Sequence, residues 1–217
     1  LKVRYRQTVL GALWAVLQPV LAVAIFTLFF GKLIGVSSEG APYPVFALAG
    51  LVPWAFFANG VTVGAASLVA NELLVRRVYF PRLVIPAGAV LAGALDAAIS
   101  MILLLLLALA LGVAPSATWL LAPLFLALTA LTSLGVAIIL AALNVRYRDV
   151  QHIVPFFVQL LMFSSPIVYS STILPQPWRT LYALNPVVGI IEGLRWSIFG
   201  AGAPPVTALA LSVVVTA

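Results

Sequence analysis

Long apolar runs alternate with short charged segments along this chain. A helix that crosses the hydrocarbon core of a membrane needs about 20 apolar residues, so each long run predicts a spanning helix. The predicted spans are 10–34, 45–68, 83–111, 118–143, 153–170 and, cut short by the end of the chain, 203–217. The pattern therefore predicts an all-α, polytopic membrane protein that has six transmembrane helices at full length.

The few basic residues indicate which side of the membrane each connecting segment faces. Of the 11 Lys and Arg residues, eight fall into three clusters that are separated by pairs of apolar runs. The clusters are Lys2, Arg4 and Arg6; Arg76, Arg77 and Arg82; and Arg146 and Arg148. By the positive-inside rule, the side that carries them is the cytoplasm. We therefore expect both termini of the full-length protein to be cytoplasmic.

The composition excludes an ordinary soluble domain. Hydrophobic residues make up 64% of the chain and charged residues only 7%, whereas soluble domains carry roughly 25% charged residues. The mean hydropathy is +1.21. The net charge of +6 is distributed over the topology signals and forms no basic stripe, so we expect no nucleic-acid partner.

The sequence lacks the motifs of the common catalytic and metal sites. There is no cysteine, and His152 is the single histidine, so we expect no metal site. No GxxxxGK[ST], GxSxG or HExxH motif occurs. We therefore expect a non-catalytic membrane protein that binds no cofactor.

Residues 69–82 contain more apolar side chains than a simple turn between two spans needs. Leucine, valine and aromatic residues surround Glu72, Arg76 and Arg77 in this segment. Such a mixture suits a helix that docks in a groove of a soluble partner, and it also suits an interfacial helix that lies on lipid headgroups. The residues alone leave both interpretations open.

Residues 171–202 also differ from a span. The Asn185-Pro186 pair divides the segment into two pieces, and neither piece is long enough to cross a bilayer. We expect two short amphipathic helices on, or re-entering, the outer face. Glu192 and Arg195 are three residues apart and could pair on one helix face.

Asp96 is the one ionisable residue deep inside a predicted span. A charge at that depth is costly, so its carboxyl group should be protonated, paired or exposed to water. A structural hydrogen bond and a role in a transport pathway both fit this position.

Aromatic residues are frequent in the predicted spans. Sugar rings stack on aromatic faces, so a channel for polysaccharide would use such side chains, whereas lipid contact or core packing would explain them equally well. The candidates for a channel are Phe26, Phe30, Trp54, Phe57, Phe157, Phe163 and Tyr169.

The sequence Val-Arg-Tyr-Arg occurs twice, at 3–6 and 145–148. Both copies precede or follow a span at the predicted cytoplasmic edge, where arginine and tyrosine suit the headgroup layer. The arginines Arg4, Arg6, Arg146 and Arg148 are therefore topology signals or contacts for an anionic ligand.

Six longer stretches, taken in order, carry a resemblance to a known family. They are LKVRYRQTVLGALWAVLQP (1–19), FALAGLVPWAFFANGV (46–61), NELLVRRVYFPRLVIP (71–86), LAALNVRYRDV (140–150), SPIVY (165–169) and LYALNPVVGIIEGLRW (181–196). Together they resemble the permease subunits of ABC-2 type exporters of polysaccharides and polyol phosphates. The stretches follow the family's order and cover nearly the whole chain.

The resemblance implies a permease of the bacterial inner membrane that works as a homodimer with two copies of a cytoplasmic ABC ATPase, which binds ATP and Mg²⁺. The implied substrate is a glycan linked to polyprenyl diphosphate: O-antigen, or alternatively capsule or teichoic acid. Residues 1–9 would end an interface helix, 69–82 would be the coupling segment, and 171–202 would form external gate helices. The usual expectation is that spans 1, 2 and 5 line the channel.

The resemblance also implies roles for particular residues. The ATPase-docking residues would be Asn71, Glu72, Leu73, Leu74, Arg76, Arg77, Tyr79 and Phe80. The gate residues would be Trp178, Arg179, Glu192 and Arg195. The lipid pyrophosphate would meet the four arginines of the repeated sequence.

Two other classes of protein compete with this interpretation. A secondary transporter centred on Asp96 would need further ion-coupling residues and usually internal repeats. A membrane enzyme would need clustered acids or histidines at a membrane edge, and the sequence has none. An ABC permease explains the missing ATP site, the segment 69–82 and the short external helices together.

Overall fold

The computed structural model of the protein describes residues 13–38, 40–173, 175, 178, 181–200 and 204–216. All regular secondary structure in this part of the chain is helical, which confirms the predicted all-α fold class. The helices are α2 (Trp14–Phe26), η2 (Thr27–Ile34), α3 (Tyr43–Ala70), α4 (Glu72–Arg77), α5 (Val84–Ala92), α6 (Ala94–Ala110), η3 (Ala117–Leu121), α7 (Ala122–Arg146), α8 (Val150–Phe163), η4 (Ser171–Ile173), α10 (Pro186–Phe199) and α11 (Val206–Thr216). Of these, η2 is a π-helix, whereas η3 and η4 are 3₁₀-helices.

Within the described residues, four helical stretches are long and apolar enough to cross a membrane. They are Trp14–Ile34, Tyr43–Ala70, Val84–Ala110 and Ala117–Arg146, and they lie close to the first four predicted spans. The helices α8 and α11 are apolar but shorter. The protein is thus a multi-pass membrane protein, and a total of six crossings stays a prediction.

The fifth predicted span differs most from the structure. It was expected over 153–170, but α8 begins at Val150 and ends at Phe163. The sequence that follows is Ser-Ser-Pro, and a proline lacks the N–H that a helix needs and disfavours helical backbone in the residue before it. Ser165 donates its hydroxyl to the Leu161 carbonyl (2.7 Å), which gives one of the last carbonyls of the helix a partner.

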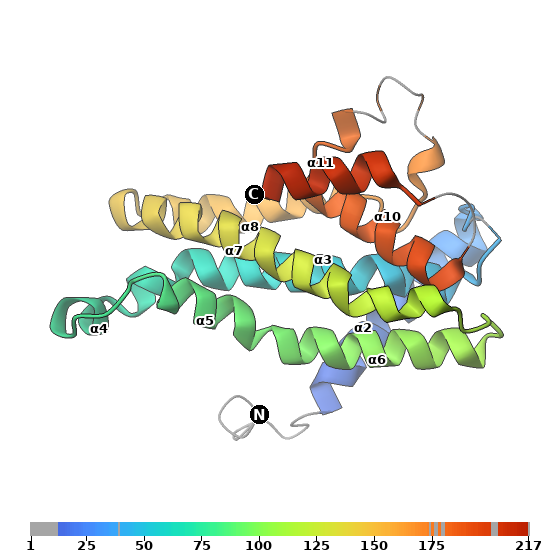
Figure 1. Cartoon of the computed structure of the whole chain (residues 1–217), viewed down its shortest axis with the longest axis horizontal. Coiled ribbons are helices and arrows are strands. Elements are labelled where there is room, and N and C mark those ends of the chain that lie inside the picture. The colour runs from blue at the N-terminus through green and yellow to red at the C-terminus, as the bar shows by residue number, and fades with distance from the viewer. Residues whose placement is uncertain are drawn as a thin grey trace.

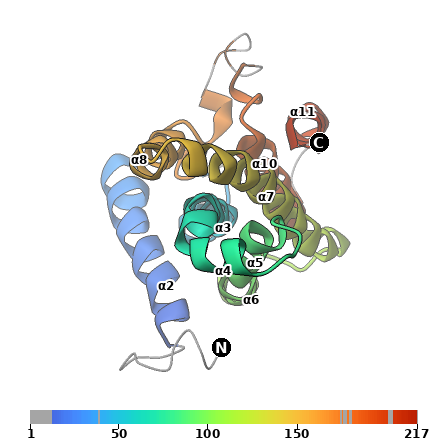
Figure 2. The same cartoon turned by 90° about the vertical axis from the view of Figure 1, so that its left-hand side faces the viewer.

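The helix α3 occupies the centre of the bundle, surrounded by α2, α5, α6, α7, α8 and α10 (Figures 1 and 2). Its closest approach to α7 depends on glycine. A Cβ atom added at Gly64 would lie 2.6 Å from the Cβ of Ala137, and one added at Gly60 would lie 3.1 Å from the Cβ of Ser133. Small residues allow two membrane helices to pack backbone against backbone, so this face of α3 is specified by its glycines.

The helix α10 packs against α3, α7 and α11 and is buried along most of its length. This burial is deeper than expected for an amphipathic helix on the outer face of a membrane. Asn185 directly precedes α10, and its side-chain oxygen accepts a hydrogen bond from the Val187 N–H (3.1 Å), as a helix N-cap should. The predicted division of 171–202 at Asn185-Pro186 therefore corresponds to the start of α10.

The bundle is elongated and has two distinct ends (Figure 1). One end carries α4 and the turn between α7 and α8, and we refer to it as the α4 end. The connections from η2 to α3 and from α6 to η3 lie at the opposite end. The basic clusters of the sequence predict that the α4 end is cytoplasmic.

Candidate functional site

The first candidate surface is α4 and the residues that flank it. The helix has only six residues, with an acid in its first turn and two arginines in its last turn, which suits the helix dipole. Glu72 and Arg76 form an exposed salt bridge (2.6 Å) four residues apart. Asn71, which precedes the helix, donates to the Ser67 carbonyl (2.8 Å) and so joins α4 to the end of α3.

The predicted docking residues are close together on this surface, and all except Phe80 are exposed. The exposed fraction is 70% for Leu73 and 48% for Leu74, and Tyr79 is fully exposed. Large apolar side chains that protrude beside charged ones are typical of a surface that another molecule covers. The geometry therefore permits docking at α4, and the partner remains a prediction.

The second candidate surface lies at the same end of the bundle. Arg146 ends α7, and its guanidinium lies 5.3 Å from the ring centroid of Tyr147. Arg148 follows in the turn before α8 and is exposed. The predicted companions Arg4 and Arg6 lie outside the described residues.

The third candidate site is a buried arginine towards the opposite end. The side chain of Arg195, on α10, is only 6% exposed. Its Nη2 donates to the Ile167 carbonyl (2.7 Å) and the Phe46 carbonyl (3.2 Å), its Nε donates to Phe46 (3.3 Å), and its Nη1 donates to Tyr169 (3.3 Å). The guanidinium carbon lies 3.5 Å from the centroid of the Phe46 ring, within the range of a cation–π contact. Arg195 thus joins α10, α3 and the segment after α8.

Glycine makes the room for this arginine. A Cβ atom added at Gly50 would lie 2.6 Å from the Ile167 carbonyl oxygen and 3.0 Å from Nη2 of Arg195. The segment after α8 is held further by Tyr43, whose hydroxyl donates to the Val168 carbonyl (2.9 Å). The SPIVY stretch of the sequence is therefore fastened to α3 and α10 by hydrogen bonds to its backbone.

Two tyrosines lie beside this anchor, and the other predicted gate residues are Trp178, Arg179 and Glu192. The hydroxyls of Tyr169 and Tyr182 are hydrogen-bonded (2.8 Å). Burial, assisted by this bond, raises the pKa of Tyr182 above its ordinary range. Glu192 is half-buried, one turn before Arg195, and their pairing stays a prediction. Trp178 is exposed, and Arg179 lies outside the described residues.

Asp96 lines a cavity of about 520 Å³ between α2, α3 and α6. The cavity also contains polar side chains from each of these helices, namely Gln18, Asn59 and Ser100. A carboxyl group among amides and a hydroxyl can be stabilised by hydrogen bonds, so this position agrees with the structural interpretation and does not exclude a pathway.

The chain matches the family described as ABC-2 type transporter over residues 1–199. It belongs to this family. The permease is 32% identical over 197 residues to the O-antigen export system permease protein RfbA of Klebsiella pneumoniae, covering 90% of this chain and 74% of the relative. It is 35% identical over 198 residues to RfbA of Myxococcus xanthus, covering 90% and 75%. The polysialic acid transport protein KpsM of Escherichia coli is 25% identical, covering 91% and 77%.

The predicted channel aromatics of this ABC-2 permease occupy two different environments. Trp54 and Phe57 are buried in the core that α3 forms with α8 and α10, and their rings lie 5.8 Å apart. Phe26 and Phe30 pack beside Tyr43 and Phe46. In contrast, Phe157 and Phe163 of α8 are 49% and 68% exposed. Of the predicted channel aromatics, Phe157 and Phe163 are thus the exposed ones in the described structure, whereas Phe26, Phe30 and Tyr169 are half-buried.

The sequence did not single out Phe46 or Gly50 as partners of Arg195. Phe46 supplies a backbone carbonyl and a ring face, and it lies 149 residues away in the chain. Every residue has a backbone carbonyl, so the sequence does not indicate which carbonyl accepts a hydrogen bond. The available signal was indirect, since both residues fall in the stretch 46–61 that carried the family resemblance.

Proposed function

We propose that this permease is the membrane subunit of an ATP-driven exporter that moves a lipid-linked polysaccharide, such as an O-antigen, across the bacterial inner membrane. The observation that carries the proposal is the similarity to two O-antigen export permeases over 90% of the chain. The lower identity to a polysialic acid transport protein makes capsule the next candidate substrate, followed by teichoic acid.

The energy source in this proposal is a separate ABC ATPase, because the sequence has no P-loop. The docking surface is α4. Leu73 and Arg77 are four residues apart and therefore share a helix face, which mixes apolar and cationic chemistry. Such a face suits a groove on a protein better than the apolar side of a membrane-surface helix.

The substrate path in this proposal lies between two copies of the permease. The pyrophosphate of the carrier lipid would first meet Arg146 and Arg148, which are exposed at the α4 end, together with Arg4 and Arg6. The glycan would then pass the exposed aromatic residues of α8. Trp178, Glu192 and Arg195 would belong to the external gate.

A pair of matched double variants tests the proposal. We expect Arg76→Glu/Arg77→Glu to abolish co-purification with the ABC ATPase and export of surface glycan, because it reverses the charge of the docking face. The control, Arg146→Glu/Arg148→Glu, makes the same charge change at the same end outside α4. It should keep the ATPase and reduce export, since only the pyrophosphate contact is removed. Co-purification in detergent and extraction of surface glycan measure the two effects.

Three results would argue against parts of this proposal. If the control exports normally at equal expression, the two arginines are topology signals only. If the α4 variant keeps its ATPase, docking lies elsewhere. If a well-folded wild-type permease binds no ATPase and its transport depends on a proton gradient, the secondary-transporter interpretation with Asp96 at its centre replaces the proposal.

A further inference from the structure

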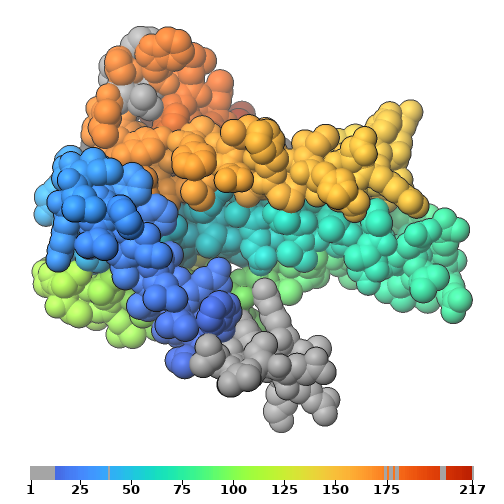
Figure 3. Space-filling view, turned by 180° about the vertical axis from the view of Figure 1, so that it is seen from behind, coloured from blue at the N-terminus to red at the C-terminus, as the bar shows by residue number. Residues whose placement is uncertain are grey.

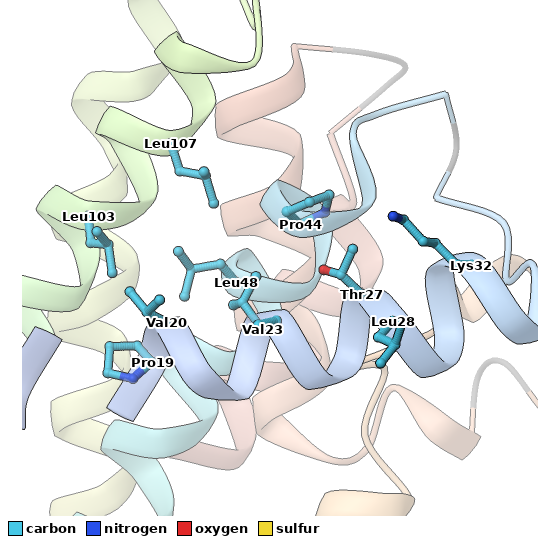
Figure 4. Close-up of a pocket in the computed structure, with 11 residues that line it drawn as sticks. Pro19, Val20, Val23, Thr27, Leu28, Lys32, Pro44, Leu48, Leu103 and Leu107 are labelled. Carbon is cyan, nitrogen blue, oxygen red and sulfur yellow. The ribbon is translucent and has the colours of Figure 1, made fainter. Parts of the chain in front are cut away.

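A mainly apolar groove runs along α2 on the side that faces α6 (Figure 4). Its volume is about 510 Å³, which lies within the usual size range of small-molecule sites. Val20 and Val23 of α2, Leu48 of α3, and Leu103 and Leu107 of α6 form its walls. The groove lies in the half of the bundle that is remote from α4.

The two polar residues of the groove lie at one end of it. Figure 4 shows Lys32, Thr27, Val23 and Pro19 in this order along the helix, so that the charge comes first, then a hydroxyl, then apolar side chains. Lys32 is exposed, in the last turn of η2. The groove is therefore cationic at its mouth and apolar in its depth.

Thr27 has a feature that the packing of this chain does not explain. Its Oγ1 is buried and, among the described residues, has no hydrogen-bond partner. A buried hydroxyl without a partner is destabilising, so an acceptor from outside the chain would satisfy it. The residue stands where α2 ends and the π-helix η2 begins.

We propose that this groove binds one anionic phospholipid. The lipid phosphate would contact the Lys32 ammonium, and an ester carbonyl would accept a hydrogen bond from the Thr27 hydroxyl. An acyl chain would lie along Val23 and Leu103. The sequence of charge, donor and apolar wall along the groove matches the order of phosphate, ester and hydrocarbon in such a lipid. A single lysine also balances the one negative charge of phosphatidylglycerol, whereas a diphosphate carrier would call for more cations.

Native mass spectrometry of the full-length permease tests the charge contact. The permease is reconstituted with equal amounts of phosphatidylglycerol and phosphatidylcholine, extracted in detergent, and analysed for the lipids it retains. We expect the wild type to retain more phosphatidylglycerol than phosphatidylcholine. In Lys32→Gln the ratio of the two retained lipids should fall about fivefold. Lys32→Arg should keep it, and Arg82→Gln, which removes a cation at the α4 end, should leave it unchanged.

The Thr27 contact is tested with the same measurement and a second lipid. Thr27→Val should weaken retention of ester-linked phosphatidylglycerol and have no effect on its ether-linked analogue, which has no ester carbonyl. Equal effects on the two lipids would contradict the contact, because retention would then not depend on the ester carbonyl. Val23→Trp should fill the groove and lower retention, whereas Ile25→Trp, on an exposed position of α2, should not.

Other occupants would give different results, and each would overturn the proposal. Equal retention of the two headgroups, or equal losses in Lys32→Gln and Arg82→Gln, would indicate general surface charge. Displacement of phosphatidylglycerol by an equimolar polyprenyl phosphate would make the groove a carrier-lipid site. Disulfide-linked dimers of Val20→Cys, which would be the sole cysteine of the chain, would show that a second copy covers the groove.

Discussion

Arg195 shows how one side chain can hold together three distant parts of the sequence. It donates hydrogen bonds to backbone carbonyls of α3 and of the segment after α8 while it lies on α10. A guanidinium offers five N–H donors on three nitrogens in a fixed, planar arrangement, whereas a lysine ammonium has three donors on a single nitrogen. The position therefore favours arginine for its geometry as well as for its charge.

We expect Arg195→Met to destabilise the permease by about 2 kcal/mol or more, because the carbonyls of Phe46 and Ile167 lose their donors while they stay buried. Arg195→Lys should recover only part of this loss. Thermal unfolding in detergent measures the effect, with the exposed Arg148→Met as the control. Equal melting temperatures for Arg195→Met and Arg148→Met would mean that the anchor contributes little.

The sequence could predict residues of this kind only in part. Arg195 is identifiable because it is a charge among apolar residues, and the family resemblance gives it a gate role. Its surroundings are not identifiable, since carbonyl oxygens and the space beside Gly50 belong to the backbone. The predicted pairing with Glu192 is a local pattern, whereas the observed contacts are long-range.

The contact between α10 and α11 is governed by small residues. A Cβ atom added at Gly189 would clash with the Ser212 hydroxyl and the Ala208 carbonyl, so the two helices approach as closely as glycine permits. Ser212 itself bonds back to the Ala208 carbonyl (2.8 Å). The position of α11 therefore depends on the absence of a side chain on α10.

We expect Gly189→Ala to push α11 away from α10 and to destabilise the fold by about 1 to 3 kcal/mol, the usual range for overpacking. Gly135→Ala is the matched control, because its added Cβ would meet only one atom, at 4.0 Å. Thermal unfolding of the two variants measures the difference. A melting temperature for Gly189→Ala as high as that of Gly135→Ala would show that the two helices can separate without cost.

The sequence predicts the presence of the helices better than it predicts their first and last residues. Charged segments and turn-rich loops such as GVAPSA (112–117) separate the first four spans, and their observed ends lie within a few residues of the expected ones. The end of α8 differs from the expected one because apolar residues resume at Ile167 and Val168 after the short Ser-Ser-Pro sequence, whereas the proline at 166 ends the helix. The π-helix η2 was not predicted either, because apolar residues such as those in 27–34 fit several helical periods.

One face of the whole molecule combines α2 and α8, with α3 visible between them (Figure 3). On α8, Phe156, Gln159 and Phe163 share a helix side and are exposed. An amide exposed to hydrocarbon is costly, so this side suits a partner chain or a water-filled path. The exposed side of α6, with Ile102 and Leu106, is apolar and suits lipid.

We expect the proposed homodimer to form through this α8 face. A single cysteine at Gln159 should form a disulfide-linked dimer when membranes are oxidised, since the chain contains no other cysteine. A cysteine at Leu106 on α6 should stay monomeric under the same conditions. Gel electrophoresis without reductant distinguishes the two, and the reverse pattern would place the dimer contact on α6.

The arrangement of the helices could not be predicted from the sequence alone. Hydropathy gives the number of apolar runs but not their neighbours, because lipid and protein interior are similarly apolar. The glycines Gly60 and Gly64 indicate that α3 packs closely, yet they do not name α7 as the partner. Likewise, Asp96 can be identified in the sequence, whereas the cavity that it shares with Gln18, Asn59 and Ser100 results from the packing of three helices.

The central position of α3 also affects how the protein is made. Among the four long helices it has the lowest mean hydropathy, 1.6, and it is the most buried. It leaves the ribosome early, whereas its closest neighbour α7 begins at Ala122 and follows several seconds later at about 5 to 20 residues per second. During that interval the glycine face of α3 is exposed to lipid or to the insertion machinery. A synthesis pause between α3 and α7 would therefore lengthen the period in which a newly made chain is most open to degradation.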